Sequence, residues 1–217
     1  MKIALIGATG YVGSAVLNEA LERGHELTAI ARNTSKVAVE HEKLSLVQAD
    51  VRESNKLAEA LKDHDVVISA YNSGWSNPDI YEEFLEGSNA IQEAVKKAEV
   101  KRLIVVGGAG SLYVDEQTQL IDTPEFPDAI KGGATAARDY LNQIKKEEEL
   151  DWTFFSPAPG MFPGNPPERR GTYRTGLETP VFDENNQSVI SVEDAAVALI
   201  DEAEEPKHIK KRFTAAY

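Results

Sequence analysis

The 217-residue chain contains 41% hydrophobic and 27% charged residues, which is typical of one globular domain with a well-buried core. Its 36 acidic residues outnumber the 23 basic ones, and the net charge of −13 argues against a general nucleic-acid or anionic-membrane binder. The absence of cysteine excludes disulfides, thiolate nucleophiles and cysteine-based metal sites. The four histidines lie far apart in the sequence, so we expect no metal site: His25, His41, His64 and His208.

The chain opens directly on an apolar run, and no stretch of about eighteen apolar residues occurs in it. We therefore expect no signal or transit peptide, no membrane span and a cytoplasmic protein. The sequence leaves the oligomeric state open between a monomer and a homodimer.

The first residues predict a strand–helix–strand unit, with strands over 2–6 and 27–31 and a helix between them. The first turn reads GATGYVG. In this turn Gly7 allows a tight bend, Gly10 lets the backbone approach a pyrophosphate, and Gly13 lets the helix pack closely. The helix N-terminus would offer N–H groups to phosphates. An ordinary strand–turn–helix is the alternative, but the flanking strands favour dinucleotide binding. The candidate phosphate-site residues are Gly7, Thr9, Gly10, Tyr11, Val12 and Gly13.

Basic residues follow the second strand, where an NAD-binding unit would carry an acidic residue for the ribose 2′-hydroxyl. Arg32 and Lys36 instead supply positive charge at this place. A guanidinium group suits a phosphate, so the sequence predicts NADP, with NADPH preferred, as the cofactor. The alternative is that both side chains belong to a solvated loop.

The same alternation of short apolar runs and longer amphipathic segments continues along the chain. A short helical or turn segment at 35–39 is followed by expected strands over 44–48, 66–69, 102–106, 152–156 and 212–216. Expected helices cover 54–61 with Ser54 as the cap, 80–98, 129–149 with an interruption at Gly132-Gly133, and 191–204. The pattern predicts an α/β fold, a Rossmann-type doubly wound parallel sheet with a small C-terminal substrate lobe. Residues 1–217 would form a single domain, with a cofactor-binding core over 1–150 and the substrate lobe over 151–217 on the same sheet.

Residues at the carboxyl ends of the expected strands are the ones that can touch a ligand. Asp50 could accept a hydrogen bond from the adenine amino group while Val51 covers the ring. An Asp that caps the next helix is an equal alternative. Further candidates along these ends are Ala70 and Tyr71 beside the ribose, Gly107, Gly108 and Ser111 beside the nicotinamide ribose, and Pro157 and Ala158 beside the carboxamide.

The GATGYVG turn, the Asp50-Val51 pair and the GGAGS strand end resemble the short-chain dehydrogenase/reductase superfamily. Later stretches at 152–158, 170–174 and 189–196 resemble its atypical branch of NADH-flavin reductases, which is related to NmrA-like proteins and biliverdin reductase B. The resemblance implies a nicotinamide cofactor and a planar acceptor, such as FMN or FAD bound as substrate.

The Tyr-x-x-x-Lys pair of the larger superfamily is missing. Tyr113 is followed four residues later by Gln117, and Tyr140 by Ile144. This removes the usual proton-transfer machinery and leaves hydride transfer that depends on positioning. Ser111 is then the best candidate for a polar residue near the hydride path.

The acceptor candidates lie in the second half of the chain. Met161 and Phe162 line the acceptor pocket or simply pack in the core, and Tyr113 and Tyr173 are weaker polar candidates. Arg170 and Arg174 hold an anionic acceptor or belong to a solvated loop.

Three functions fit these observations. The first is an NADPH-dependent reductase of a flavin-like or quinone-like acceptor. The second is an NmrA-like NADP(H) sensor that binds the cofactor without turnover. The third is an epimerase or dehydratase of nucleotide sugars, which normally needs the missing pair.

Overall fold

The computed structural model describes residues 1–164 and 167–217. The strands are β1 (Lys2–Ile6), β2 (Glu26–Ala31), β3 (Leu44–Gln48), β4 (Val66–Ser69), β5 (Arg102–Val106), β6 (Asp151–Pro157), β7 (Arg174–Gly176) and β8 (Lys211–Ala216). The α-helices are α1 (Tyr11–Glu22), α2 (Ser54–Leu61), α3 (Ile80–Lys97), α4 (Asp128–Ile144) and α5 (Val192–Glu204). Short 3₁₀ turns are η1 (Thr34–Lys36), η2 (Ala109–Ser111) and η3 (Leu120–Asp122).

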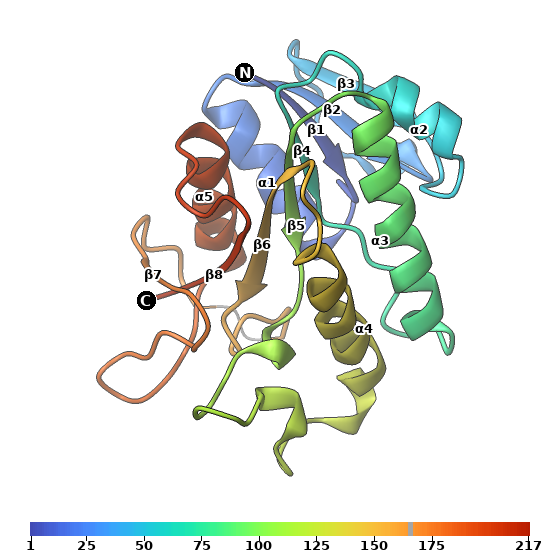
Figure 1. Cartoon of the computed structure of the whole chain (residues 1–217). Helices are drawn as coiled ribbons and strands as arrows, with labels where there is room; N and C mark the ends of the chain where they lie inside the picture. The colour runs from blue at the N-terminus through green and yellow to red at the C-terminus, as the bar shows by residue number, and fades with distance from the viewer. Residues whose placement is uncertain (165–166) are drawn as a thin grey trace.

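The strands form one sheet in the order β3-β2-β1-β4-β5-β6-β8-β7. All neighbouring pairs are parallel except β7 and β8 (Figure 1). The strand order reverses between β1 and β4, which is the place where sheets of this kind bind ligands. The expected doubly wound parallel sheet is confirmed.

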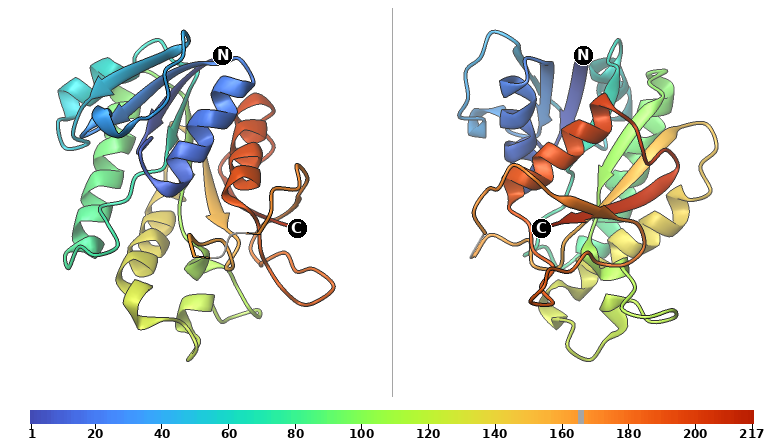
Figure 2. Two further views of the ribbon diagram at one scale, coloured as in Figure 1. Left: turned by 180° about the vertical axis from the view of Figure 1, so that it is seen from behind. Right: turned by 90° about the vertical axis from the view of Figure 1, so that its left-hand side faces the viewer.

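Helices cover both faces of the sheet, and each face has its own apolar core. Figure 2 shows α1 beside α5 on one face, while α2, α3 and α4 cover the other. Because side chains alternate along a strand, Ile3 and Leu5 of β1 pack toward the α1–α5 side. Ala4 and Ile6 pack toward the α2–α4 side. The central strands β4 and β5 are buried along their whole length.

Three expected details of the helices are wrong. Helix α4 runs without a break through Gly132-Gly133, because these glycines let it pack closely on Ile80. A Cβ at Gly132 would lie 3.3 Å from one Ile80 methyl group, and a Cβ at Gly133 would lie 2.8 Å from the other. It also ends at Ile144 rather than 149, since the Glu147 carboxylate turns back and accepts from the Glu149 main-chain N–H at 2.7 Å. Ser54 is the first residue of α2 and not its cap.

Candidate functional site

A cavity of about 150 Å³ lies at the carboxyl end of the sheet, where the strand order reverses. The β1–α1 turn and the loops after β2, β3 and β4 form its walls. It brings together the predicted cofactor residues Gly7, Thr9, Gly10, Arg32, Asp50, Val51, Ala70 and Tyr71. Sequence reasoning missed the lining residues Ile6, Ile30, Ala31, Ala49, Arg52, Asn72 and Glu83.

The three glycines of the first turn play different structural parts. Gly7 has a φ of +81°, and a Cβ there would lie 2.4 Å from the Ala70 carbonyl oxygen. A Cβ at Gly13 would lie 2.1 Å from the Gly7 carbonyl oxygen, so Gly13 brings α1 against the turn. Gly10 precedes the first turn of α1, and its Cβ would meet only the Gly7 carbonyl oxygen, at 3.3 Å, among the described residues. The open side of the turn is therefore at Gly10.

Tyr11 is the first residue of α1, and it does not line the cavity. Its hydroxyl group is buried, and no partner for it occurs among the described residues. Burial, and then the charge of Glu193, raises the pKa of Tyr11, so the hydroxyl keeps its proton. Such a group needs a hydrogen-bond partner, and a bound molecule or water can supply one. Val12 packs against the apolar core of this face.

Two arginines, rather than the one expected, line the cavity beside Asp50. The Asp50 Oδ1 atom accepts from the Arg52 main-chain N–H at 2.9 Å and from Arg52 Nε at 3.2 Å. The hydrogen bond from the Arg52 side chain, the largest cause, lowers the pKa of Asp50, which stays ionised and paired. Arg32 is exposed at the same wall, and Lys36 lies four residues further on, in η1. Arg52 could have been predicted from its place directly after Asp50 and Val51, at the carboxyl end of β3.

Tyr71 follows β4 and forms part of the cavity wall next to the glycine turn. Its hydroxyl donates to the Glu83 main-chain oxygen at 3.1 Å, and its ring stacks on Phe84 with centroids 6.1 Å apart. Burial is the main cause that raises its pKa, so the phenol stays neutral. Ala70 is half-buried and places no bulk beyond a methyl group beside the cavity.

The residues after β5, which we expect beside the nicotinamide ribose, have different surroundings. A Cβ at Gly107 would lie 1.9 Å from the Phe154 ring, so this glycine serves core packing, whereas a Cβ at Gly108 would have room, 3.5 Å from Ala137. Ser111 is 2% exposed, and its Oγ accepts from Arg212 of β8 at 2.9 Å. The Ser111 hydroxyl therefore already has a fixed partner, and its proton and one lone pair are left for a ligand.

The Arg212 side chain is itself buried and pairs with Glu178. Tyr113 lies beside it, with the Arg212 guanidinium carbon 6.0 Å from the ring centroid. Tyr140 is a core residue whose hydroxyl donates to Gln92 Oε1 at 3.2 Å. Burial raises the pKa of Tyr140, which makes it a poor proton donor or acceptor in catalysis.

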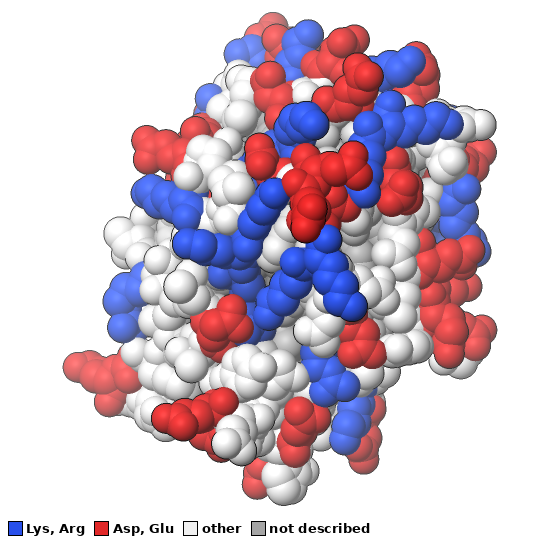
Figure 3. Space-filling view, in the orientation of Figure 1, with Lys and Arg blue, Asp and Glu red and all other residues white. Residues whose placement is uncertain are grey.

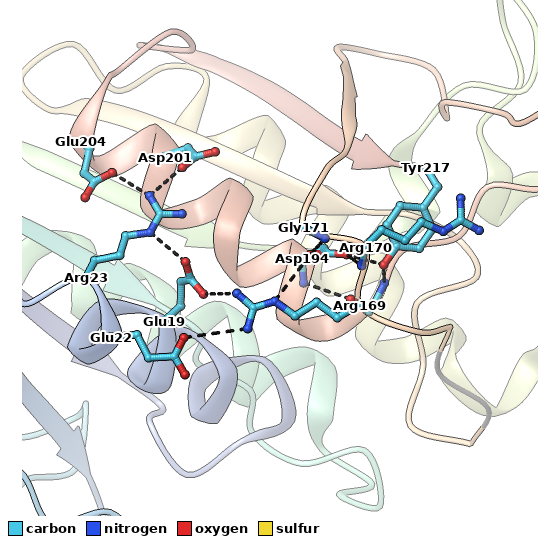
Figure 4. Close-up of polar contacts among 11 residues, drawn as sticks. Glu19, Glu22, Arg23, Arg169, Arg170, Gly171, Asp194, Asp201, Glu204 and Tyr217 are labelled. Atoms are coloured by element: carbon cyan, nitrogen blue, oxygen red, sulfur yellow. Dashed lines mark hydrogen bonds and ion pairs between the residues drawn. The ribbon is translucent and has the colours of Figure 1, made fainter.

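Arg170 and Arg174, for which the sequence left open an anionic acceptor or a solvated loop, both contact other parts of the chain, and Figure 4 shows Arg170 beside Tyr217. The Arg170 guanidinium lies 4.0 Å from the Tyr217 ring centroid, while its main-chain N–H donates to Asp194 at 2.6 Å. Arg174 donates to the main-chain oxygens of Phe182 and Tyr217. Arg174 therefore holds the chain's own groups, whereas the Arg170 guanidinium is exposed beside the Tyr217 ring.

Tyr173, one of the weaker acceptor candidates, contacts α5 in this structure. Its hydroxyl donates to Asp201 of α5 at 2.5 Å, and the same carboxylate accepts from Arg23 at the end of α1. Burial and this hydrogen bond raise the pKa of Tyr173. The carboxylate that organises the neighbouring loop is Asp194, which is fully buried and also accepts from the Tyr217 hydroxyl at 2.5 Å. Its signal was the Ser191-x-x-Asp194 spacing, because Ser191 caps α5.

The loop after β6 reaches the carboxyl end of the sheet. Pro157 ends β6, and Ala158 is buried against the α1–α5 core. Met161 is half-buried and packs on the same core, as the packing alternative requires. Phe162 is 52% exposed and is the apolar side chain of this loop that is open to an acceptor.

The described parts of the chain, 1–164 and 167–217, contain no helix that is long and apolar enough to cross a membrane. The same parts contain no group of three or more His, Asp or Glu side chains arranged to hold a metal ion. On the face shown in Figure 3, Lys and Arg side chains gather in the middle with Asp and Glu around and between them. That face therefore carries no continuous basic surface.

Comparison with known proteins agrees with this geometry. The sequence profile of the NAD(P)H-binding family matches residues 7–205. The uncharacterized protein YwnB of Bacillus subtilis is 39% identical over 216 residues, which cover 99% of this chain and 97% of YwnB. A structure of a candidate epimerase from Bacteroides thetaiotaomicron is 47% identical with a TM-score of 0.91, covering 100% of this chain and 96% of that one. A candidate NADH-flavin reductase from Streptococcus pneumoniae is 37% identical with a TM-score of 0.87, covering 100% and 99%.

The sheet order and the glycine turn define a Rossmann-type dinucleotide-binding protein. The chain belongs to the NAD(P)H-binding family. The resemblance to atypical short-chain dehydrogenases/reductases is confirmed at the level of this family.

Proposed function

We propose that the protein is an NADPH-dependent reductase that passes a hydride directly to a planar, flavin-like or quinone-like acceptor. The observation that carries the proposal is the cavity at the strand reversal, which joins an open glycine turn to two arginines. The similarity to the candidate NADH-flavin reductase supports the acceptor class.

The residues of the cavity suggest how a dinucleotide would be oriented, with its adenine end toward β3 and its pyrophosphate at the glycine turn. The pyrophosphate would lie at Gly10, where the turn is open, and would receive the N–H groups at the start of α1. The adenine would lie between Val51 and Tyr71, with Asp50 held ionised at its rim. Arg32 and Arg52 would face the 2′-phosphate, for which a guanidinium group is well shaped.

The remaining chemistry is that of positioning. When bound, the cofactor supplies the hydride, and the chain's own residues orient it and exclude water. Gly108, Pro157 and Ala158 would border the nicotinamide end. The Ser111 hydroxyl, fixed by Arg212, would present its proton to the acceptor or to the nicotinamide carboxamide.

Two other functions predict different outcomes. A cofactor sensor is favoured by the core position of Tyr140, because its hydroxyl group is not free for acid–base work. An epimerase is the class of the candidate from Bacteroides thetaiotaomicron. It would need a proton-transfer pair, and no tyrosine in the sequence has a lysine four residues later.

The test mixes the purified protein with NADPH and either FMN or a soluble quinone, and follows the nicotinamide absorbance. If the protein is a reductase, it should oxidise NADPH at a rate that saturates with rising acceptor concentration. NADPH binding by calorimetry with no oxidation in the presence of any acceptor would favour the sensor. Failure to bind either nicotinamide cofactor would contradict all of these functions.

A further inference from the structure

Helix α3 carries one glycine in its middle, Gly87, and the space beside it is occupied by Tyr71. A Cβ at Gly87 would lie 2.4 Å from Cε1 and Cζ of the Tyr71 ring and 2.5 Å from its hydroxyl oxygen. Glycine inside a helix costs stability relative to alanine, so its presence calls for a local reason. The reason in this helix is that the edge of the Tyr71 ring lies directly on the bare Cα.

The Tyr71 ring makes two further contacts with α3. Its hydroxyl donates to the Glu83 main-chain oxygen, one turn before Gly87, and its face stacks on Phe84. These two contacts fix the ring along the helix, and Gly87 sets how closely it approaches. Ordinary van der Waals contact begins at 3.4 Å, so a methyl group at Gly87 would move the ring by about 1 Å.

The main chain of the same segment is pressed against the phosphate turn. A Cβ at Gly7 would lie 2.4 Å from the Ala70 carbonyl oxygen and 3.2 Å from the Tyr71 nitrogen. The Ala70-Tyr71 segment is thus held between two glycines, one in the β1–α1 turn and one in α3. This segment lines the cavity, so a shift of the Tyr71 ring away from α3 changes the space left for the proposed cofactor.

We propose that Gly87 is a positioning residue for cofactor affinity, which acts by seating Tyr71 on α3 and keeping its ring out of the dinucleotide cavity. The proposal rests on the proposed function for the place of the cofactor. Gly87 itself does not line the cavity, and it acts only through Tyr71.

The experiment measures the NADPH dissociation constant by calorimetry and the thermal midpoint for four variants of the full chain. They are Gly87→Ala, Tyr71→Leu, the two combined, and Gly132→Ala as the control. Gly132 is also a helix-interior glycine, and among the described residues its Cβ would meet only an Ile80 methyl group, at 3.3 Å. We expect Gly87→Ala to weaken NADPH binding about tenfold, and Gly132→Ala to leave it unchanged. In the Tyr71→Leu background, adding Gly87→Ala should no longer change the dissociation constant.

Unchanged NADPH binding by Gly87→Ala would overturn the proposal, as would an equal loss in the Tyr71→Leu background. If Gly87→Ala does not fold, the combined variant decides. Removal of the Tyr71 ring should then restore folding, and a combined variant that still fails to fold contradicts the proposed contact between the ring and Gly87. The wild-type titration tests the proposed function separately. Even without NADPH binding, the thermal midpoint should fall with Gly87→Ala in the wild type and rise in the Tyr71→Leu background.

Discussion

Replacement of Gly10 by valine should abolish cofactor binding and leave the fold intact. Gly10 has a φ of −81° and a ψ of 172°, an extended conformation that suits a β-branched residue. Among the described residues its Cβ would meet only the Gly7 carbonyl oxygen, at 3.3 Å, a contact that a shift of a few tenths of an ångström relieves. We therefore expect a stability change within about 1 kcal/mol.

The two methyl groups of the new side chain would occupy the open side of the turn, where the pyrophosphate is proposed to approach. Loss of the charge-assisted hydrogen bonds there, at about 1.5–3 kcal/mol each, would weaken binding by at least about a hundredfold if two are lost. Gly13→Ala is the matched contrast, because its Cβ would lie 2.1 Å from a main-chain oxygen. That variant should lose stability.

Calorimetry with NADPH and thermal unfolding separate these effects. A folded Gly10→Val protein that binds NADPH as tightly as the wild type would refute the phosphate site. A Gly13→Ala protein as stable as the wild type would refute the packing argument.

Three further predictions follow from other residues of the chain. Arg32→Ala should weaken NADPH binding about tenfold or more and leave NADH binding nearly unchanged, as calorimetry with both cofactors can measure. In steady-state reduction of FMN, Tyr140→Phe should remain nearly as active as the wild type and Ser111→Ala should lose more, whereas a collapse of Tyr140→Phe would indicate acid–base catalysis. Burial opposes ionisation of Glu147, but Lys96 and other hydrogen-bond donors outweigh it and lower its pKa from 4.5 to about 2. Glu147 therefore stabilises the fold above pH 4.5, and Glu147→Gln should lower the thermal midpoint at pH 7, with a difference that vanishes as the pH falls to about 2.

Local patterns were enough to place the first unit of the fold. The bounds of β1, β3, β4 and β5 agree with the sequence prediction, because each is a short apolar run ended by glycine or polar residues. The turn at Gly7 and the cavity residues that follow β2, β3 and β4 were found because they occupy the ends of consecutive strands. Such residues need no knowledge of distant partners.

Contacts between distant residues account for the errors. Ser111 accepts from Arg212, which is 101 residues away, and nothing near Ser111 in the sequence marks this pairing. Arg170 was judged by its charge, yet its place is decided by Tyr217 and by the buried Asp194. The end of α4 depended on Glu147 turning back toward Lys96 of α3. Each of these partners becomes a neighbour only when the sheet is complete.

The cavity at the strand reversal is proposed to hold a nicotinamide dinucleotide. Hydrogen exchange of the protein with and without saturating NADPH, followed by peptide mass spectrometry, tests it at the level of segments. A dinucleotide bound there should slow exchange over 7–13, 30–32, 49–52 and 70–72, with little change in α2 and on the outer side of α5. Protection confined to other segments, or none while the protein stays folded, would contradict the account.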